Sequence, residues 1–244
     1  MQTGEVCHRT SVRCGVRSQA SGPDFSENWL DPPKAPKKRR ATRRGQGGAL
    51  ENRGIARAKK KAVAEGYHLY YHDESTLQRC ANVVPTYAPK GKTPVLPLFD
   101  TKGYQHVCIA SSISTTGDMF FRIRDSSFKG EGIVNYLKEL LAHTSEKILL
   151  IWDNASWHKS DETSAFLRSK AGERLWVARI PPYAPELNPD ELVWANLKRV
   201  QLPNRVAKNS KALKQMAQEA MTVIQNSVEL VKSFFNSQNY YFTS

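Results

Sequence analysis

The chain has 244 residues and a formal net charge of +13, from 36 Lys and Arg against 23 Asp and Glu. Its length accommodates one ordinary domain with an extension, and its hydrophobic content of 40% excludes a wholly disordered chain. No apolar run reaches the roughly 20 residues of a membrane helix, and no signal-peptide pattern opens the chain. Four cysteines without metal-ligand spacing favour reduced thiols. These features predict a cytoplasmic protein, and the positive excess predicts a nucleic-acid partner.

Most of the positive charge lies in residues 34–61, which contain twelve basic residues and one acidic residue. We therefore expect 1–61 to be a basic, flexible or poorly ordered N-terminal arm, and 62–244 to be a folded domain with C-terminal helices. Phosphate contact and a solvated linker with a short helix over 54–65 are equally good interpretations of the arm. The arm's candidate DNA-binding residues are Lys37, Lys38, Arg39, Arg40, Arg43 and Arg44.

From residue 67 the sequence shows alternating strand-like and helix-like segments, an order typical of a mixed sheet covered by helices. A Thr-Thr-Gly-Asp turn joins two of the strands into an antiparallel hairpin, and residues 86–93 are expected to form a turn. The predicted strands cover 67–72, 104–114, 119–125, 147–152 and 175–180, and the predicted helices cover 131–143, 160–170, 189–200 and 209–236.

Three acidic residues lie at the ends of these elements. Asp73 follows the first strand, Asp153 follows the apolar strand KILLIW, and Glu191 follows a Pro-rich loop. Acids at the ends of buried strands are partly desolvated, so they need a partner or a cation. Carboxylate oxygens suit Mg²⁺ or Mn²⁺, and two such ions can support a phosphodiester displacement.

Each acid also has a structural interpretation. Asp73 could open a turn, and Asp153 could form an Asx turn with Asn154. Glu191 falls at the capping-box position of a helix that Asn188 would cap. His158 could orient Asp153 or be a surface histidine. From the residue types alone these alternatives stay open.

Taken together, the segments DES…YAPKGKTPV, LLIWDNASWHKS and PPYAPELNPDELVWANLKR resemble the catalytic domain of bacterial insertion-sequence transposases of the DDE superfamily, which are related to the mariner and Tc transposases. The resemblance covers roughly residues 67–200. Its third motif is the most specific, and its first is weak alone. Between Asp153 and Glu191 there are 37 residues, at the long end of the spacing in this branch.

The resemblance implies an α/β, ribonuclease-H-like fold in which Asp73, Asp153 and Glu191 bind two Mg²⁺ or Mn²⁺ ions. It implies cleavage at the element ends followed by strand transfer into target DNA, by a DNA-bound protein of the bacterial cytoplasm and nucleoid. A homodimer would suit the joining of two ends. Asn154 and His158 are candidates to orient the ligands, and Lys90 and Lys92 are phosphate-contact candidates or parts of an exposed turn.

Family members usually carry N-terminal helix-turn-helix domains that recognise the element ends. Residues 1–61 are too basic and too poor in periodic apolar residues to form them, so we expect a truncated or frameshift-joined copy with weak, unspecific DNA binding. The alternatives are an inactive transposase remnant that binds DNA through its basic arm, and a nuclease that cleaves without joining strands.

Overall fold

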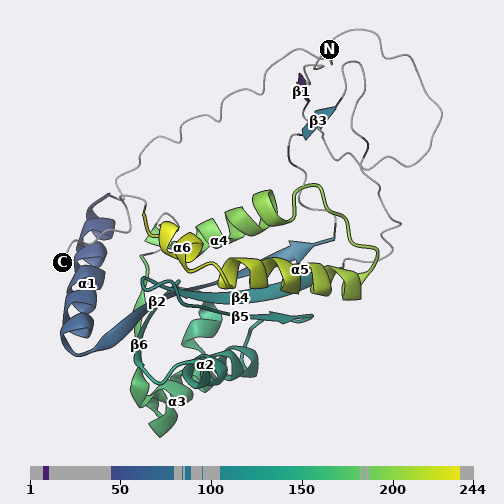
Figure 1. Cartoon of the computed structure of the whole chain (residues 1–244). Coiled ribbons are helices and arrows are strands. Elements are labelled where there is room, and N and C mark those ends of the chain that lie inside the picture. The colour runs from purple at the N-terminus through teal and green to yellow at the C-terminus, as the bar shows by residue number, and fades with distance from the viewer. Residues whose placement is uncertain are drawn as a thin grey trace.

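The computed structural model describes residues 8–10, 45–79, 84, 86–88, 95, 105–181, 184 and 187–236, and its centre is a five-stranded mixed sheet (Figure 1). The strand order is β5–β4–β2–β6–β7, and a separate antiparallel pair joins β1 and β3. The strands are β1 (His8–Thr10), β2 (Tyr67–Gln78), β3 (Thr86–Ala88), β4 (His106–Ser114), β5 (Met119–Arg124), β6 (Lys147–Trp152) and β7 (Leu175–Arg179).

The central strand β2 has one antiparallel and one parallel neighbour. It pairs antiparallel with β4 and parallel with β6, while β4 continues antiparallel to β5 and β6 continues parallel to β7. The pairing with β6 ends at Tyr71↔Ile151, whereas the pairing with β4 continues to Gln78↔His106. Among the described residues, a strand therefore holds only one edge of β2 beyond Tyr71.

Helices cover both faces of the sheet (Figure 1). One face packs against α1, α4, α5 and α6, and the other packs against α2 and α3. The helices are α1 (Gly45–Ala64), α2 (Glu131–His143), α3 (Asp161–Arg168), α4 (Asp190–Asn196), α5 (Ser210–Gln225) and α6 (Val228–Ser233). A 3₁₀ turn, Ser156–Lys159, follows β6, and a π-helical turn, Leu197–Gln201, extends α4.

Alternation along the strands explains the two cores. Tyr71 and Ile151 lie in the core beneath α4 and α5, while Tyr70 and Trp152 lie in the core beneath α2 and α3. All side chains of β6 after Lys147 are buried, as its continuous apolar sequence predicts for a strand covered on both faces. The site residues within β2 therefore also point alternately to one core and to the other.

The predicted fold class is confirmed: it is a mixed sheet flanked by helices, in agreement with the ribonuclease-H-like fold that the resemblance implies. The hairpin, the helix over 131–143 and the central strand are also confirmed. Three elements differ. Residues 86–88, expected to belong to a turn over 86–93, form strand β3, which is extended through its pairing with β1. The first strand continues to Gln78 because β4 pairs along its whole length, and the expected helix over 209–236 is two helices broken at Asn226 and Ser227.

The end of the expected N-terminal arm forms part of the fold. Helix α1 begins at Gly45, crosses residue 61 and ends at Ala64. Its Ile55 and Ala62 are buried in the core beneath α4 and α5, and Lys59 donates a hydrogen bond to the hydroxyl of Tyr71. Helix α1 is thus longer than the short helix expected over 54–65. The division into an arm and a domain stays a prediction for residues that lie outside those described.

Within the part of the chain that the structure describes, no helix has both the length and the apolar character needed to cross a membrane.

Candidate functional site

Asp73 lies on β2, two residues beyond the last pairing with β6, on the face covered by α4. The indole N–H of Trp194 on α4 donates a 2.8 Å hydrogen bond to Asp73 Oδ2. Burial raises the pKa of Asp73 to about 6; the Trp194 hydrogen bond opposes this shift, and the negative charge of Glu191 adds to it. A cation beside Asp73 would offset both the cost of burying its negative charge and the repulsion from Glu191.

Glu191 lies in the first turn of α4 and is exposed. The start of this helix is docked on the edge of β2 that lacks a strand partner, because Asn188 Nδ2 donates to the carbonyl of His72 at 3.3 Å. Asn188 Oδ1 also accepts from the backbone N–H of Asp190 at 3.3 Å. These two hydrogen bonds of Asn188 therefore hold the first turn of α4, and with it Glu191, beside Asp73.

Asp190 is a fully buried carboxyl group next to Glu191. Its Oδ1 accepts a 2.6 Å hydrogen bond from Ser111, the residue that pairs with Asp73 across β4 and β2. Within the described residues, Oδ2 is buried with no hydrogen-bond partner. Burial raises the pKa of Asp190 well above its usual range, and the charges of Asp73 and Glu191 act in the same direction. Burial thus favours the neutral form of Asp190.

Asp153 follows the last residue of β6 and is exposed. Its Oδ1 accepts from the backbone N–H of Ala155 at 2.9 Å, so the Asx turn expected from the sequence is present. The same oxygen lies 2.9 Å from His158 Nδ1, and this hydrogen bond lowers the pKa of Asp153. Asn154 instead donates to the carbonyl of Ile180 at 2.7 Å, and so ties the end of β6 to the end of β7.

His158 links Asp153 to a second carboxylate, Glu74 of β2. Its ring is buried and stacks on Trp152, with ring centroids 4.1 Å apart. His158 Nε2 lies 3.3 Å from Glu74 Oε1, and Trp157 Nε1 donates to Glu74 Oε2 at 3.0 Å. Burial alone would lower the pKa of His158, but Asp153 and Glu74 outweigh it and raise the pKa to about 9. His158 is therefore a cation between two carboxylates.

The pKa of Glu74 falls to about 2. Burial would raise it, but the interactions with His158 and His72 outweigh that effect. Glu74 stays ionised throughout the physiological range.

The structure places the three predicted acids where β6 ends beside the middle of β2, so Asp73 lies within a strand and does not follow one as expected. Asp73 and Glu191 interact electrostatically, and Asp153 lies at the corresponding position of the neighbouring strand. Their oxygens do not form a common ligand set: within the described chain, the group whose ligand atoms all lie within 4.8 Å of one another is His72, Glu74 and His158. In this structure Asp153 is oriented by its turn and by His158.

Sequence reasoning missed Glu74, Asp190, His72, Ser111 and Trp194. The sequence could have assigned Asp73 and Glu74 to different faces of the sheet, because the side chains of neighbouring strand residues point to opposite faces. The three buried serines of β4, which lie in an otherwise largely apolar strand, were a further signal of buried polar partners. The basic candidates Lys37, Lys38, Arg39, Arg40, Arg43, Arg44, Lys90 and Lys92 lie outside the described residues.

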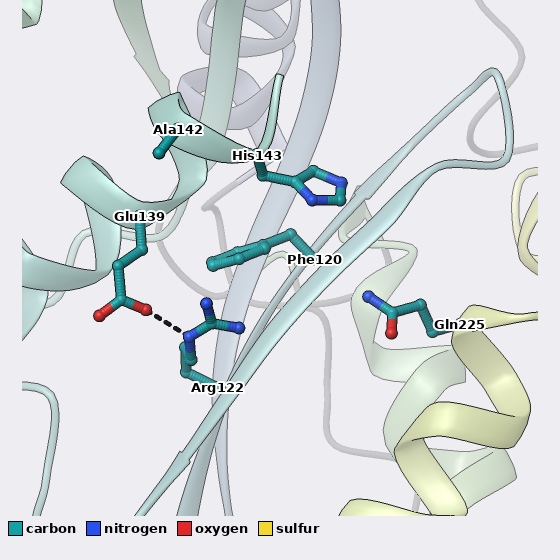
Figure 2. Close-up of a pocket in the computed structure, with 6 residues that line it drawn as sticks. All are labelled: Phe120, Arg122, Glu139, Ala142, His143 and Gln225. Atoms are coloured by element: carbon teal, nitrogen blue, oxygen red, sulfur yellow. Dashed lines mark hydrogen bonds and ion pairs between the residues drawn. The ribbon is translucent and has the colours of Figure 1, made fainter.

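A cavity of about 300 Å³ lies away from the acids, between β5, α2 and the end of α5 (Figure 2). Arg122 and Glu139 form an ion pair along its wall, and Phe120, Ala142, His143 and Gln225 complete the lining. None of the three predicted acids lines it.

The fold matches solved structures of the Mos1 mariner transposase. A pre-cleavage Mos1 transpososome matches with a TM-score of 0.54 and 13% identity, over 80% of this chain and 62% of that chain. The Mos1 strand transfer complex matches with a TM-score of 0.54 and 12% identity, over 81% and 61%. A mariner Mos1 paired-end complex with Mg matches with a TM-score of 0.54 and 11% identity, over 82% and 63%. The chain thus corresponds to about three-fifths of the Mos1 transposase, and at this identity the match shows the fold.

No curated protein matches the chain in sequence. The family described as DDE superfamily endonuclease matches residues 68–214, a span that contains Asp73, Asp153 and Glu191. More than half of the chain is covered, and the matched span includes the whole five-stranded sheet except Tyr67. The chain therefore belongs to the DDE superfamily endonucleases.

Proposed function

We propose that this protein cleaves DNA and transfers the freed strand in a metal-dependent transposition reaction, with Asp73, Asp153 and Glu191 as its metal ligands. The observation that carries the proposal is the meeting of β2, the end of β6 and the first turn of α4, where Glu191 repels the partly buried Asp73 and Asp153 directly follows the neighbouring strand β6. Family membership supports the endonuclease activity. The Mos1 complexes, one of them with Mg, support DNA as substrate and a divalent ion as cofactor.

The residues fit a hard divalent cation. All three proposed ligands are carboxylates, and the pKa of Asp73 is raised by burial and by the charge of Glu191, both of which a bound cation would offset. When bound, Mg²⁺ or Mn²⁺ ions stabilise charge on the attacking and leaving oxygens of the phosphodiester. A pair of ions held by the three acids is the arrangement that the resemblance implies.

The chain's own residues position these ligands. Trp194 holds Asp73 Oδ2, and the Asn188 anchor holds the first turn of α4. His158 holds Asp153 Oδ1, and Asn154 fixes the backbone beyond β6 through Ile180. Catalysis of in-line displacement depends on such positioning, because small misplacements of the reacting groups cost large factors in rate.

The experiment incubates the full chain with supercoiled DNA, and with duplexes that carry candidate element ends, in Mg²⁺ or Mn²⁺. We expect metal-dependent nicking or cleavage in the wild type and a loss of at least about a hundredfold in Asp153→Asn. Asp125→Asn is the matched control, because Asp125 is an exposed acid that pairs with Lys214 at 3.0 Å. Joined products in the same reactions would demonstrate strand transfer.

Three other results would change the assignment. DNA binding without cleavage, unaffected by Asp153→Asn, indicates an inactive remnant. Cleavage without joined products at any tested end sequence indicates a nuclease. Equal cleavage by wild type and Asp153→Asn contradicts the proposed ligands. Light scattering of the DNA complex tests the proposed homodimer.

A further inference from the structure

Two buried histidines and a carboxylate converge on the face of the sheet opposite Asp73. His72 and Glu74 alternate with Asp73 along β2, and His158 comes from the 3₁₀ turn after β6. The side chains of His72 and His158 are 0% and 2% exposed, and that of Glu74 is 17% exposed. One ligand atom from each residue lies within 4.8 Å of the other two.

The separations match those of ligands around a tetrahedral ion. His72 Nε2 lies 3.5 Å from Glu74 Oε1, and His158 Nε2 lies 3.3 Å from the same oxygen. Bonds of about 2.0–2.2 Å in a tetrahedral Zn²⁺ site place neighbouring ligand atoms about 3.3–3.5 Å apart. A small inward movement of one imidazole ring brings the two histidine ligand atoms to a similar separation.

The outer nitrogen of each ring already has the partner that metal-bound histidines require. His158 Nδ1 lies 2.9 Å from the Asp153 carboxylate, and His72 Nδ1 lies 3.1 Å from Ser112 Oγ. Such contacts fix the ring and direct Nε2 toward an ion. Among the described residues, His72 Nε2 is fully buried and makes no hydrogen bond, since its contact with Glu74 falls short of hydrogen-bond geometry.

We propose that His72, Glu74 and His158 form a second metal site, specific for a transition metal of the Zn²⁺ class and separate from the three-carboxylate site. Two imidazoles and one carboxylate are a zinc ligand set, whereas Mg²⁺ prefers oxygen ligands alone. Solvent that enters beside the partly exposed Glu74 supplies the fourth ligand. His158 serves both sites: the ion replaces the proton on Nε2, which is released to solvent, while Nδ1 keeps its contact with Asp153.

The test measures Zn²⁺ binding by calorimetry on the full chain, stripped of metal and without DNA. We expect one tight Zn²⁺ per chain that excess Mg²⁺ does not displace. Co²⁺ in its place should give the intense visible absorption of a tetrahedral ion. Because no DNA or catalysis is involved, the outcome is independent of whether the chain cleaves DNA.

Variants assign the site. His72→Asn, Glu74→Gln and His158→Gln should each bind one Zn²⁺ fewer or bind it at least about tenfold more weakly. His143→Gln is the matched control: His143 also pairs with a carboxylate, Asp118 at 3.0 Å, but lacks a second histidine. Asp153→Asn should weaken Zn²⁺ binding about tenfold through His158, while Asp73→Asn should leave it unchanged.

Circular dichroism verifies that each variant is folded, and Glu74→Gln serves if a histidine variant is not. The proposal is overturned if the wild type binds no Zn²⁺. It is equally overturned if the folded cluster variants bind Zn²⁺ like the wild type, or if Co²⁺ gives only the weak absorption of an octahedral ion.

Discussion

Asp73 is a destabilising group in the metal-free protein. Its pKa rises from 3.8 to about 6 on folding, so the unfolded chain releases the proton more readily than the folded one. Stability therefore falls as pH rises from about 4 to about 6, and the full penalty persists above that range. Active sites commonly contain such groups, because the arrangement that binds a cation is unfavourable without it.

Replacing Asp73 by Asn should stabilise the metal-free protein at pH 8 by about 1–3 kcal/mol, because the amide is uncharged and can still accept from Trp194. The melting temperature should rise by at least about 2 °C. Thermal unfolding with a chelator at pH 8 and at pH 4.5 measures the effect, which should shrink at the lower pH. A variant that melts at or below the wild-type temperature at pH 8 would contradict the assignment.

The turn of the β4–β5 hairpin requires a glycine at Gly117. Gly117 has a φ of +91°, and a Cβ there would lie 2.6 Å from Val228 Cγ1 and 2.9 Å from the carbonyl oxygen of Val228. The turn is thus docked on the start of α6. Glycine is required both for the left-handed backbone and for this close approach.

We expect Gly117→Ala to lower the free energy of unfolding by about 2–4 kcal/mol. Gly66→Ala is the control, because Gly66 has a φ of +77° but an added Cβ meets nothing within 4 Å. That change should cost only about 1 kcal/mol. Denaturant unfolding of both variants separates backbone strain from the clash, and equal losses would show that the contact with α6 is unimportant.

Elements with strong local patterns could be predicted from the sequence. The apolar run before Asp153 predicts a doubly covered strand, and the Thr-Thr-Gly-Asp turn predicts the hairpin. The last part of β2 could not be predicted, because residues 73–78 are mostly polar and are extended through their pairing with β4. The same holds for the break between α5 and α6, which interrupts an otherwise continuous amphipathic pattern.

The candidate site was predictable only in part, for a related reason. Asp73, Asp153 and Glu191 follow sequence motifs, so the resemblance identifies them. The contacts of Glu74 with His158 and Trp157 join residues more than eighty positions apart, and no local period reports them. The capping interpretation, with Asn188 as N-cap and Glu191 at the capping-box position, differs from the structure, in which Pro189 is the N-cap of α4. Asn188 instead anchors the start of the helix on His72, a contact that depends on the end of the β6 pairing.

At the scale of the whole molecule, the net charge of +13 is concentrated in residues 34–61. Helix α1 carries part of this charge on the sheet's edge, with Lys59 buried beside Tyr71. Burial lowers the pKa of Lys59 to about 8. This lysine is therefore a structural residue, and DNA contact is expected from the other basic residues.

DNA binding by the full chain should be weak, insensitive to sequence and steeply dependent on salt. Replacing the six basic candidates of the arm by Gln should reduce the slope of log K against log salt by up to about 5. Fluorescence anisotropy with two unrelated duplexes over a salt series measures this slope. A footprint restricted to one duplex at physiological salt would contradict the prediction of an unspecific arm. The six residues are Lys37, Lys38, Arg39, Arg40, Arg43 and Arg44.

Two of the five tryptophans donate their indole N–H to site carboxylates, one on each face of the sheet. Trp194 contacts Asp73, and Trp157 contacts Glu74. Indole emission responds to the charge and hydrogen bonding of such a partner, so each of the two proposed metal sites would have its own fluorescent reporter. Emission changes on adding Mg²⁺ or Zn²⁺ would then distinguish an ion at Asp73 from an ion at Glu74, before any DNA is added.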